Sequence, residues 1–288
     1  MNLYSITEIK ELLERGGFTF SKKYGQNFLI NEGVPKKIAS LSREATKSEK
    51  AACIEIGPGI GSLTKQLCAF YDKVLCFEID DRLPPLLDET LSGCDHVEIV
   101  LRDILKVDLK REIEEKLDGY SVSVCANLPY YITSEIIMAL LESRICFESI
   151  TVMVQKEVAE RLSSKPGTEN YGAITAAVNY YADVKTLMCV APSNFIPRPK
   201  VDSAVIRLTP KKVPDVTPKD EKLFLDVLHG AFAQRRKTLL NSLSSYLNGY
   251  SKDMISKALE QSGISPTVRG ETLSISDFAK ISDSHKGI

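Results

Sequence analysis

The sequence predicts an α/β fold with a mostly parallel sheet, followed by a small all-α domain toward the C-terminal end. Between residues 50 and 155, short apolar runs rich in Val and Ile alternate with segments of helical periodicity. This alternation is typical of a parallel sheet that is covered by helices on both faces. From residue 220 onward the periodicity is helical only, which favours a bundle of short helices.

Seven apolar runs are expected to form the strands of the sheet. The last two are joined by the short, Pro-rich link APSNFIPRPK, which favours an antiparallel final hairpin on an otherwise parallel sheet. The expected strands are 52–56, 74–80, 97–101, 122–126, 150–154, 184–190 and 201–208.

Segments with apolar residues every three or four positions are expected to form helices. The first twenty residues also have a helical, mixed-charge pattern, to which we assign no role. The prolines and lysines of KKVPDVTP, residues 211–218, indicate a boundary, so we expect one domain at 1–211 and a second, helical one at 212–288. The expected helices are 62–70, 83–91, 133–142, 157–163, 171–181, 220–233, 236–247, 252–262 and 275–282.

The composition is that of an ordinary soluble protein, with 43% hydrophobic and 26% charged residues. No stretch approaches the ~18 uncharged apolar residues of a membrane helix, and the charges among the first twenty residues argue against a signal peptide. The seven cysteines form no CxxC pair and the three histidines are scattered. We therefore expect reduced thiols in a cytoplasmic protein, with no metal site.

The near-zero net charge hides an uneven distribution. From Cys189 to the end, 15 Lys and Arg residues stand against 10 Asp and Glu residues, although the whole chain has a formal net charge of -1. A basic C-terminal third on an acidic body favours a polyanionic partner that is contacted through one part of the protein.

The first site signal is the glycine-rich sequence EIGPGIG, which directly follows the first expected strand. Glycines such as Gly57 let the backbone turn sharply and approach a ligand, and the next helix presents free N–H groups there. Glu78 lies at the end of the second strand, where a carboxylate can accept both hydroxyls of an adenosine ribose. Asp103 follows the third strand and is placed to accept from an adenine amino group.

These residues alone leave the cofactor open. The spacing GxGxG differs from the GxGxxG of dinucleotide enzymes. It suits S-adenosylmethionine, whose single nucleoside needs no pyrophosphate cradle, while NAD stays open on this pattern alone.

The fourth strand decides between the two cofactors, because it ends in Asn127, Leu128, Pro129 and Tyr130. An exocyclic amine such as adenine N6 is a poor nucleophile, since its lone pair is delocalised into the ring. Two acceptors, the Asn127 side-chain carbonyl and the Leu128 backbone carbonyl, can bind its N–H groups and free that lone pair. Pro129 stiffens the turn, and Tyr130 offers a face on which an extruded base can stack. The sequence therefore predicts methyl transfer to an aromatic amine.

With these motifs in order, the chain resembles the KsgA/RsmA family of small-subunit rRNA adenine dimethyltransferases. The resemblance runs from about residue 20 to 273, with Asp103 at the matching position. Its motifs are KKYGQNFL (22–29), EIGPGIGSLT (55–64), FEID (77–80), NLPYYI (127–132), NFIPRPKVDSAVIRL (194–208) and AFAQRRKTLLNSL (231–243).

The resemblance implies a Rossmann-like class I methyltransferase domain with S-adenosylmethionine as its cofactor. The implied reaction is dimethylation of N6 on two adjacent adenosines, in a hairpin loop near the 3′ end of 16S rRNA. The implied partner is 16S rRNA within the immature small ribosomal subunit, with a role in subunit biogenesis, and we expect a monomer that binds no membrane. The implied cofactor contacts are Asn27, Leu29, Gly57, Glu78, Asp103 and Asn127.

RNA contacts are expected from three segments. In the first, Lys22 and Lys23 face RNA phosphates from a flap over the cofactor. In the second, Phe195 forms part of the wall of the base pocket, while Arg198 and Lys200 contact phosphate, with a stiff hairpin connection as the alternative. The third segment, in the C-terminal domain, grips the RNA backbone, with a solvated or interdomain face as the alternative; it comprises Arg235, Arg236 and Lys237.

Three other functions share parts of this pattern. An Erm-type 23S rRNA adenine methyltransferase has a similar glycine loop and an asparagine-led tetrapeptide, but the C-terminal motifs look like the KsgA family. A DNA adenine methyltransferase is disfavoured, since no separate target-recognition domain is evident. A ribosome-assembly factor with incidental catalysis is a different class of protein, and such a binding role can coexist with catalysis.

Overall fold

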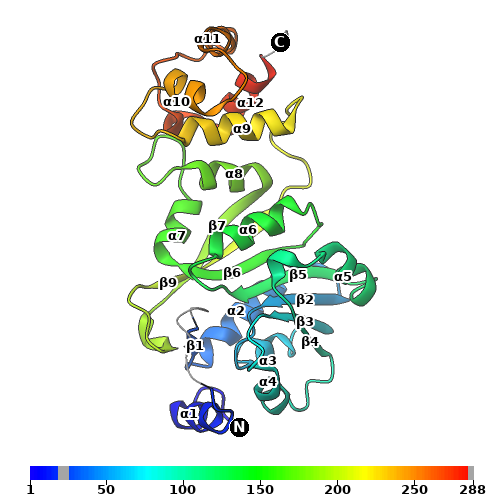
Figure 1. Ribbon diagram of the computed structural model, residues 1–288. Helices are drawn as coiled ribbons and strands as arrows, with labels where there is room; N and C mark the ends of the chain where they lie inside the picture. Colours follow the sequence, from blue (N-terminus) through cyan, green and yellow to red (C-terminus); the bar gives the residue numbers. More distant parts are fainter. Residues whose placement is uncertain (19–25, 285–288) are drawn as a thin grey trace. The chain divides into compact units, whose positions relative to one another are not determined.

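The computed structural model describes residues 1–18 and 26–284, which form two compact units. The first unit comprises Met1–Ala159 and Val184–Pro210, and the second comprises Glu160–Asp183 and Lys211–Ile288 (Figure 1). The second unit includes residues 160–183, which the sequence-based division at 1–211 and 212–288 places in the first domain. That division stays a prediction.

The described part of the first unit is built on a seven-stranded sheet, which confirms the predicted fold class. Its strand order is β4-β3-β2-β5-β6-β9-β7, and the pairs from β4 to β6 are parallel. The last strand, β9, runs antiparallel to β6, as predicted. The strands are β2 (Ala51–Ile56), β3 (Lys73–Glu78), β4 (Val97–Leu101), β5 (Ser121–Asn127), β6 (Ile150–Gln155), β7 (Ala182–Val190) and β9 (Ser203–Pro210).

The strand order reverses at β2, which pairs with β3 on one side and with β5 on the other. Every residue of β2 is buried, as expected for the central strand of a sheet that is covered on both faces. In open α/β sheets, ligands bind outside the carboxyl ends of the strands at such a reversal.

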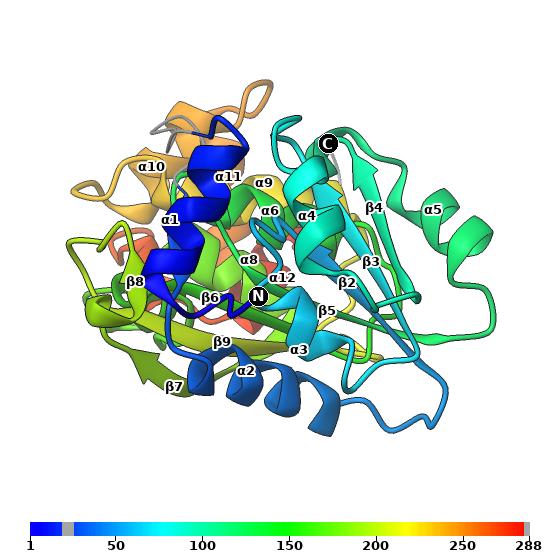
Figure 2. The ribbon, with the colours of Figure 1, turned by 90° about the horizontal axis from the view of Figure 1, so that it is seen from below.

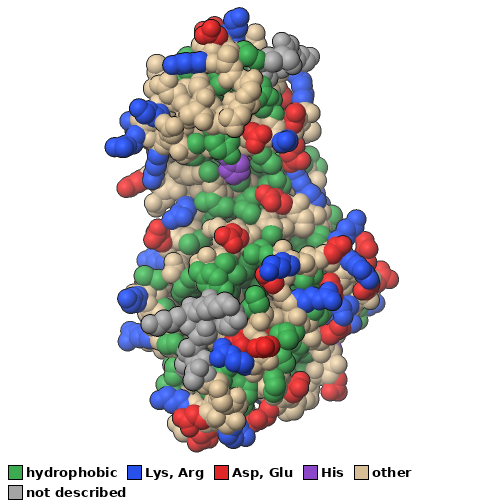
Figure 3. Space-filling model, in the orientation of Figure 1, with side chains coloured by type: hydrophobic (Ala, Val, Ile, Leu, Met, Phe, Trp, Pro, Cys, Tyr) green, Lys and Arg blue, Asp and Glu red, His purple; other side chains and the backbone are tan. Residues whose placement is uncertain are grey.

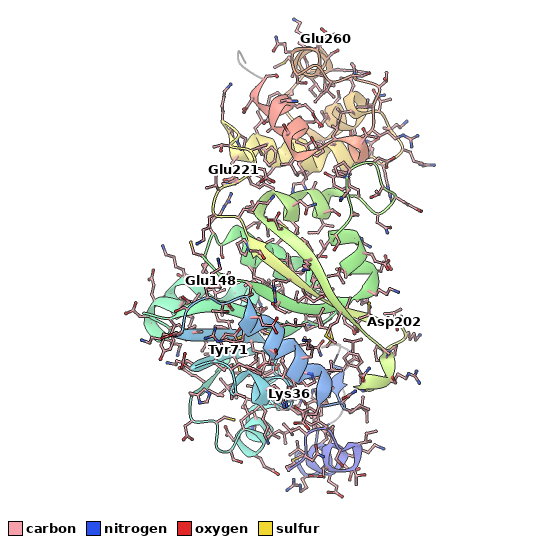
Figure 4. The ribbon with its side chains drawn as sticks, turned by 180° about the vertical axis from the view of Figure 1, so that it is seen from behind. Lys36, Tyr71, Glu148, Asp202, Glu221 and Glu260 are labelled. Atoms are coloured by element: carbon pink, nitrogen blue, oxygen red, sulfur yellow. The ribbon has the colours of Figure 1, made fainter. Side chains whose placement is uncertain are left out.

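Helices and short connecting strands surround this sheet. Helix α2 packs against β5 and β6, and Figure 2 shows it lying along one face of the sheet. Figure 4 shows the molecule from behind, with Lys36 on α2 and Tyr71 near that helix. The Tyr71 hydroxyl lies 2.8 Å from the hydroxyl of Ser42, a residue of α2. The elements are α1 (Ile6–Arg15), β1 (Phe28–Leu29), α2 (Gly33–Glu44), α3 (Thr64–Leu67), α4 (Pro84–Thr90), η2 (Ile104–Lys106), α5 (Leu109–Lys116), α6 (Thr133–Glu142), η3 (Pro192–Asn194) and β8 (Phe195–Ile196).

Helix α1, where the sequence pattern is helical, packs on α4. Its apolar residues Ile9, Leu12 and Leu13 share one buried cluster with Leu86 and Leu87 of α4. Outside this cluster, the Arg15 guanidinium lies 2.7 Å from the Glu89 carboxylate. Helix α1 thereby covers α4, the first α-helix after β3.

The second unit consists of helices in its described residues, which agrees with the predicted periodicity. Helix α9 contacts α8, α10 and α12. Its Phe224 ring lies 4.8 Å from the ring of Tyr180 on α8, whose hydroxyl donates to Glu221. Gly270 is required where η4 meets α9, because a Cβ atom there would lie 2.4 Å from the Ala231 carbonyl oxygen. The helices are α7 (Lys156–Leu162), which begins in the first unit, α8 (Ala173–Tyr181), α9 (Glu221–Phe232), α10 (Leu239–Tyr246), α11 (Lys252–Gln261), η4 (Gly270–Thr272) and α12 (Ile275–Asp283).

Candidate active site

A pocket opens at the carboxyl ends of β2, β3, β4 and β5. The parallel register places Ile56 beside Phe77 and Glu78 beside Leu101, so the segments that follow these strands reach the same edge of the sheet. All six residues that the resemblance assigns to the cofactor line this pocket, together with the tetrapeptide: Asn27, Leu29, Gly57, Glu78, Asp103, Asn127, Leu128, Pro129 and Tyr130.

The glycine loop forms the floor of the pocket after β2. Gly57 has φ +69° and donates its N–H to the Phe77 carbonyl at 2.9 Å, which holds the turn against β3. Gly59 has φ +60°, and a Cβ atom on it would lie 3.0 Å from the Phe28 ring. Without a side chain, Gly57 can adopt the positive φ of this turn. Without a side chain at Gly59, the Phe28 ring can pack against the glycine loop.

Glu78 is the last residue of β3, and its side chain is almost entirely enclosed, with 5% of the residue exposed. Its Oε1 atom accepts from the N–H groups of Ile79 and Asp80 at 2.8 and 2.9 Å, and Oε2 lies 3.4 Å from the Gly59 nitrogen. Burial raises the pKa of Glu78, although the backbone hydrogen bonds oppose that shift. The carboxylate is thus fixed at the floor of the pocket as an acceptor.

Asp103 lies directly beyond β4, at the start of η2. Its Oδ1 atom accepts from the Leu105 N–H at 3.1 Å, and its Oδ2 atom lies 3.7 Å from the Lys106 ammonium. These contacts fix the carboxylate at the edge of the pocket.

Asn127 is the last residue of β5 and is tethered through its nitrogen. The side-chain Nδ2 donates to the backbone carbonyl of Asn27 at 3.2 Å. An amide that is held through its nitrogen keeps its oxygen as an acceptor. This orientation is the one that the amine-binding role of Asn127 requires.

The residues after Asn127 are held from two neighbouring strands. The Leu128 N–H donates to the Met153 carbonyl of β6 at 3.1 Å, and the Tyr130 hydroxyl lies 2.6 Å from the Ser203 hydroxyl of β9. The Pro129 carbonyl accepts from the Thr133 hydroxyl at 3.0 Å, which joins the turn to α6. Burial raises the pKa of Tyr130, and its hydrogen bond to Ser203 partly offsets this shift. The tetrapeptide is therefore a rigid turn with a neutral tyrosine.

The pocket residues that the sequence reasoning misses include Glu55 and Gln26. Glu55 lies on β2, is 1% exposed and lines the pocket, and burial raises its pKa to about 8. An acidic residue inside the apolar run AACIEI is the signal that points to it. Gln26 also lines the pocket, and its Nε2 donates to Asp80 at 2.8 Å; nothing in its spacing indicates that contact.

A family model described as ribosomal RNA adenine dimethylase matches residues 17–286 of the chain. The chain belongs to this family. It is therefore an rRNA adenine methyltransferase, as the motifs predicted.

Curated relatives and solved structures agree with this membership. Three relatives, from Bacillus cytotoxicus, Bacillus mycoides and a Geobacillus species, are each 47% identical over 277 residues, covering 95% of this chain and 94% of theirs. Each is named ribosomal RNA small subunit methyltransferase A. These names agree with the predicted small-subunit family and not with the 23S alternative.

Two solved structures are similar to the chain. A dimethyladenosine transferase from Plasmodium falciparum is 28% identical, with a TM-score of 0.71, and the match covers 88% of this chain and 95% of that one. The 23S rRNA methyltransferase ErmE matches with a TM-score of 0.65 over 90% of this chain and all of its own, at 24% identity. At that identity the second likeness supports the fold alone.

The residues predicted to contact RNA differ in their exposure and in their contacts. Lys22 and Lys23 lie outside the described residues. Arg198 and Lys200 are exposed on the segment after β8. Phe195 is buried and pairs with Leu29, which itself lines the pocket; its place in the wall of the base pocket stays a prediction.

The third basic segment lies in the turn between α9 and α10, beside which Figure 3 shows several Lys and Arg side chains. Arg235 donates to the Glu169 carbonyl at 2.6 Å and lies 3.9 Å from the Glu271 carboxylate. It therefore joins the segment before α8 to this turn. Arg236 and Lys237 are exposed.

Neither a cluster of metal ligands nor a membrane helix occurs in the described part of the chain. Within residues 1–18 and 26–284, no three His, Cys, Asp or Glu side chains converge as metal ligands would. None of the helices in those ranges has the length and apolar character needed to span a membrane.

Proposed function

We propose that the pocket binds S-adenosylmethionine and presents the target adenine N6 to Asn127 and Leu128. The observation that carries this proposal is the tether between Asn127 Nδ2 and the Asn27 carbonyl. It leaves the side-chain oxygen of Asn127 as an acceptor at the end of β5, beside the rigid turn of Leu128.

The residues of the pocket suit this cofactor. The ribose hydroxyls require an acceptor, and Glu78 is a fixed, enclosed carboxylate. The adenine amino group requires an acceptor at the pocket edge, which Asp103 supplies. A nucleoside needs close backbone approach, and the positive φ angles of Gly57 and Gly59 allow it. Asn27 and Leu29 complete the wall.

When bound, S-adenosylmethionine supplies an electron-poor methyl group on its sulfonium sulfur. The protein contributes alignment and electrostatics. The Asn127 oxygen and the Leu128 carbonyl accept the two N–H groups of adenine N6, which favours a pyramidal nitrogen with an available lone pair. Tyr130, fixed by Ser203, provides a face for the extruded base. No general base is required, because the ammonium formed on N6 is strongly acidic.

The proposed substrate is a pair of adjacent adenosines in a hairpin loop near the 3′ end of 16S rRNA. The choice of small-subunit rRNA is supported by the names of the 47% identical relatives, and contact with RNA is supported by the exposed basic residues Arg236 and Lys237. We propose that the RNA is presented within an immature small subunit. We propose that the enzyme acts as a monomer in the cytoplasm, with a role in small-subunit biogenesis.

Incubation of the protein with labelled S-adenosylmethionine and unmethylated small subunits, followed by mapping of the labelled nucleotides, tests this function. We expect label on N6 of two adjacent adenosines in one hairpin loop of 16S rRNA. Label on 23S rRNA alone, or on scattered adenosines, would contradict the proposal.

A further inference from the structure

An ion pair between the buried Asp80 and the partly exposed Arg82 lies just outside the pocket, in the turn after β3. The Asp80 side chain is 1% exposed, and its two oxygens receive Nε and Nη2 of Arg82 at 2.7 and 2.6 Å. The Arg82 backbone N–H also donates to Oδ1 at 3.2 Å. Burial alone raises the pKa of Asp80, but the hydrogen bonds from Arg82 and Gln26 outweigh it and lower the pKa. Asp80 is therefore a charged, fixed acceptor.

The same ion pair holds the chain on both sides of residues 19–25, which lie outside the described structure. On one side, the Arg82 guanidinium lies 4.5 Å from the centre of the Phe18 ring. On the other side, the Gln26 side chain donates to Asp80 Oδ2 at 2.8 Å. Phe18 and Gln26, which are eight residues apart, thus both contact this ion pair.

Both points continue into the wall of the pocket. The Phe18 ring packs against Phe28 at 6.2 Å between centroids, and Phe28 covers Gly59 of the glycine loop. Gln26 precedes Asn27, whose carbonyl holds the Asn127 amide. Asp80 is itself absent from the described lining of the pocket.

We propose that Asp80 is a positioning residue of the active site, which acts through Gln26 to hold residues 26–29 as the pocket wall and thereby orients Asn127. This inference rests on the proposed function, because it assumes that this wall contacts the cofactor. It assigns a role to a buried charge that has no place in the chemistry described above.

A double-mutant cycle in the full chain tests this role, with the variants Gln26→Met, Asp80→Asn and the two combined. Gln26→Met keeps the length of the side chain but removes the donor. Each single variant is expected to weaken equilibrium binding of S-adenosylmethionine roughly tenfold, the order expected for loss of a hydrogen bond to a charged group. The double variant is expected to bind no more weakly than Asp80→Asn alone, since Gln26→Met removes only a contact that Asp80→Asn has already disrupted.

Binding is measured by equilibrium dialysis, and kcat, KM and the melting temperature are measured on the same preparations. The positioning role predicts a rise in KM for the cofactor with Gln26→Met and little change in melting temperature. Arg15→Gln is the matched control, because it breaks another ion pair of the first unit, between exposed side chains at 2.7 Å. Its cofactor binding is expected to equal that of the unaltered protein.

The possible outcomes separate this inference from the proposed function. Additive effects of the two changes would overturn the inference, since Gln26 would then contact the cofactor independently of Asp80. Binding of the Gln26→Met variant within twofold of the unaltered protein would also overturn it. If the unaltered protein itself binds no S-adenosylmethionine, the proposed function fails and the cycle has no basis.

Discussion

The side-chain nitrogen of Asn127 donates to the backbone carbonyl of Asn27 at 3.2 Å, although the two residues are 100 positions apart in the chain. This contact joins the end of β5 to the segment before β1. It orients the side chain that the proposed reaction needs as an acceptor for the N–H group of adenine N6. The geometry of the reaction is thus tied to the placement of a distant backbone atom.

Tyr130 is expected to contribute its ring and not its hydroxyl to the reaction. Replacement by Phe removes the contact with Ser203 but keeps the aromatic face, so most turnover should remain. Replacement by Ala removes a stacking interaction of roughly 1–3 kcal/mol, which should raise KM for the RNA by about one to two orders of magnitude. Steady-state kinetics on unmethylated small subunits compares the two variants, and equal losses would refute the stacking role.

Glu78 is expected to determine cofactor affinity and its pH dependence. Burial raises the pKa of Glu78, and the ionised carboxylate is the better acceptor for ribose hydroxyls. Affinity should therefore be full at alkaline pH and decline as the pH falls through this raised pKa. Glu78→Ala should weaken binding roughly 10- to 100-fold, by loss of hydrogen bonds to a charged group, and remove this pH dependence. Equilibrium dialysis between pH 5 and 8 measures both effects, and unchanged affinity would rule out the ribose assignment.

Glu55 is expected to make the stability of the fold depend on pH. Burial raises its pKa from 4.5 to about 8, so between these values the folded chain holds a proton at Glu55 that the unfolded chain has released. The free energy of unfolding should therefore fall as the pH rises through this range, by about 1.4 kcal/mol per pH unit at most.

Glu55→Gln mimics the protonated side chain and should flatten this dependence. Denaturant unfolding of both proteins at pH 5.5 and 7.5 checks the expectation. Glu49→Gln, at an exposed position before β2, is the control and should keep the slope. A slope that survives in Glu55→Gln would assign the effect to other groups.

Arg236 and Lys237 are expected to bind RNA phosphate. Neutralising both to Gln should weaken RNA binding and reduce the slope of log affinity against log salt by roughly 0.7–0.9 for each phosphate that the protein no longer neutralises. The control neutralises two exposed lysines of α11, Lys252 and Lys257, which changes the net charge equally. Equal changes in slope for both pairs would indicate a general charge effect. Arg236 and Lys237 would then be solvent-exposed residues that do not contact RNA.

Much of this fold follows from local sequence patterns. The expected strand 97–101 and helix 133–142 have the observed bounds. The strand is rich in β-branched residues, and the apolar residues of the helix recur at helical spacing and are buried. Helix α5 was missed, since LKREIEEK has too few apolar residues for a clear stripe and is stabilised by the Asp108 cap and its own ion pairs. The pairing of β1 with β8 was also missed, because two-residue strands carry no periodic signal.

The site was predictable where its residues follow strands. Glu78, Asp103 and Asn127 come together because parallel strands end at one edge of the sheet. The contacts of Gln26 with Asp80 and of Asn127 with Asn27 join residues 54 and 100 positions apart. Such contacts depend on tertiary packing, which no local pattern specifies.

The single-turnover rate of the Asn127→Ala variant tests the central claim most directly. It is measured on unmethylated small subunits at saturating S-adenosylmethionine, with Asn248→Ala, at an exposed position in the second unit, as the control. Loss of one positioned group that acts on the reacting atom should lower the rate roughly 10²- to 10³-fold, while the melting temperature stays close to that of the unaltered protein. A near-normal rate in the folded variant would contradict activation of adenine N6 by Asn127.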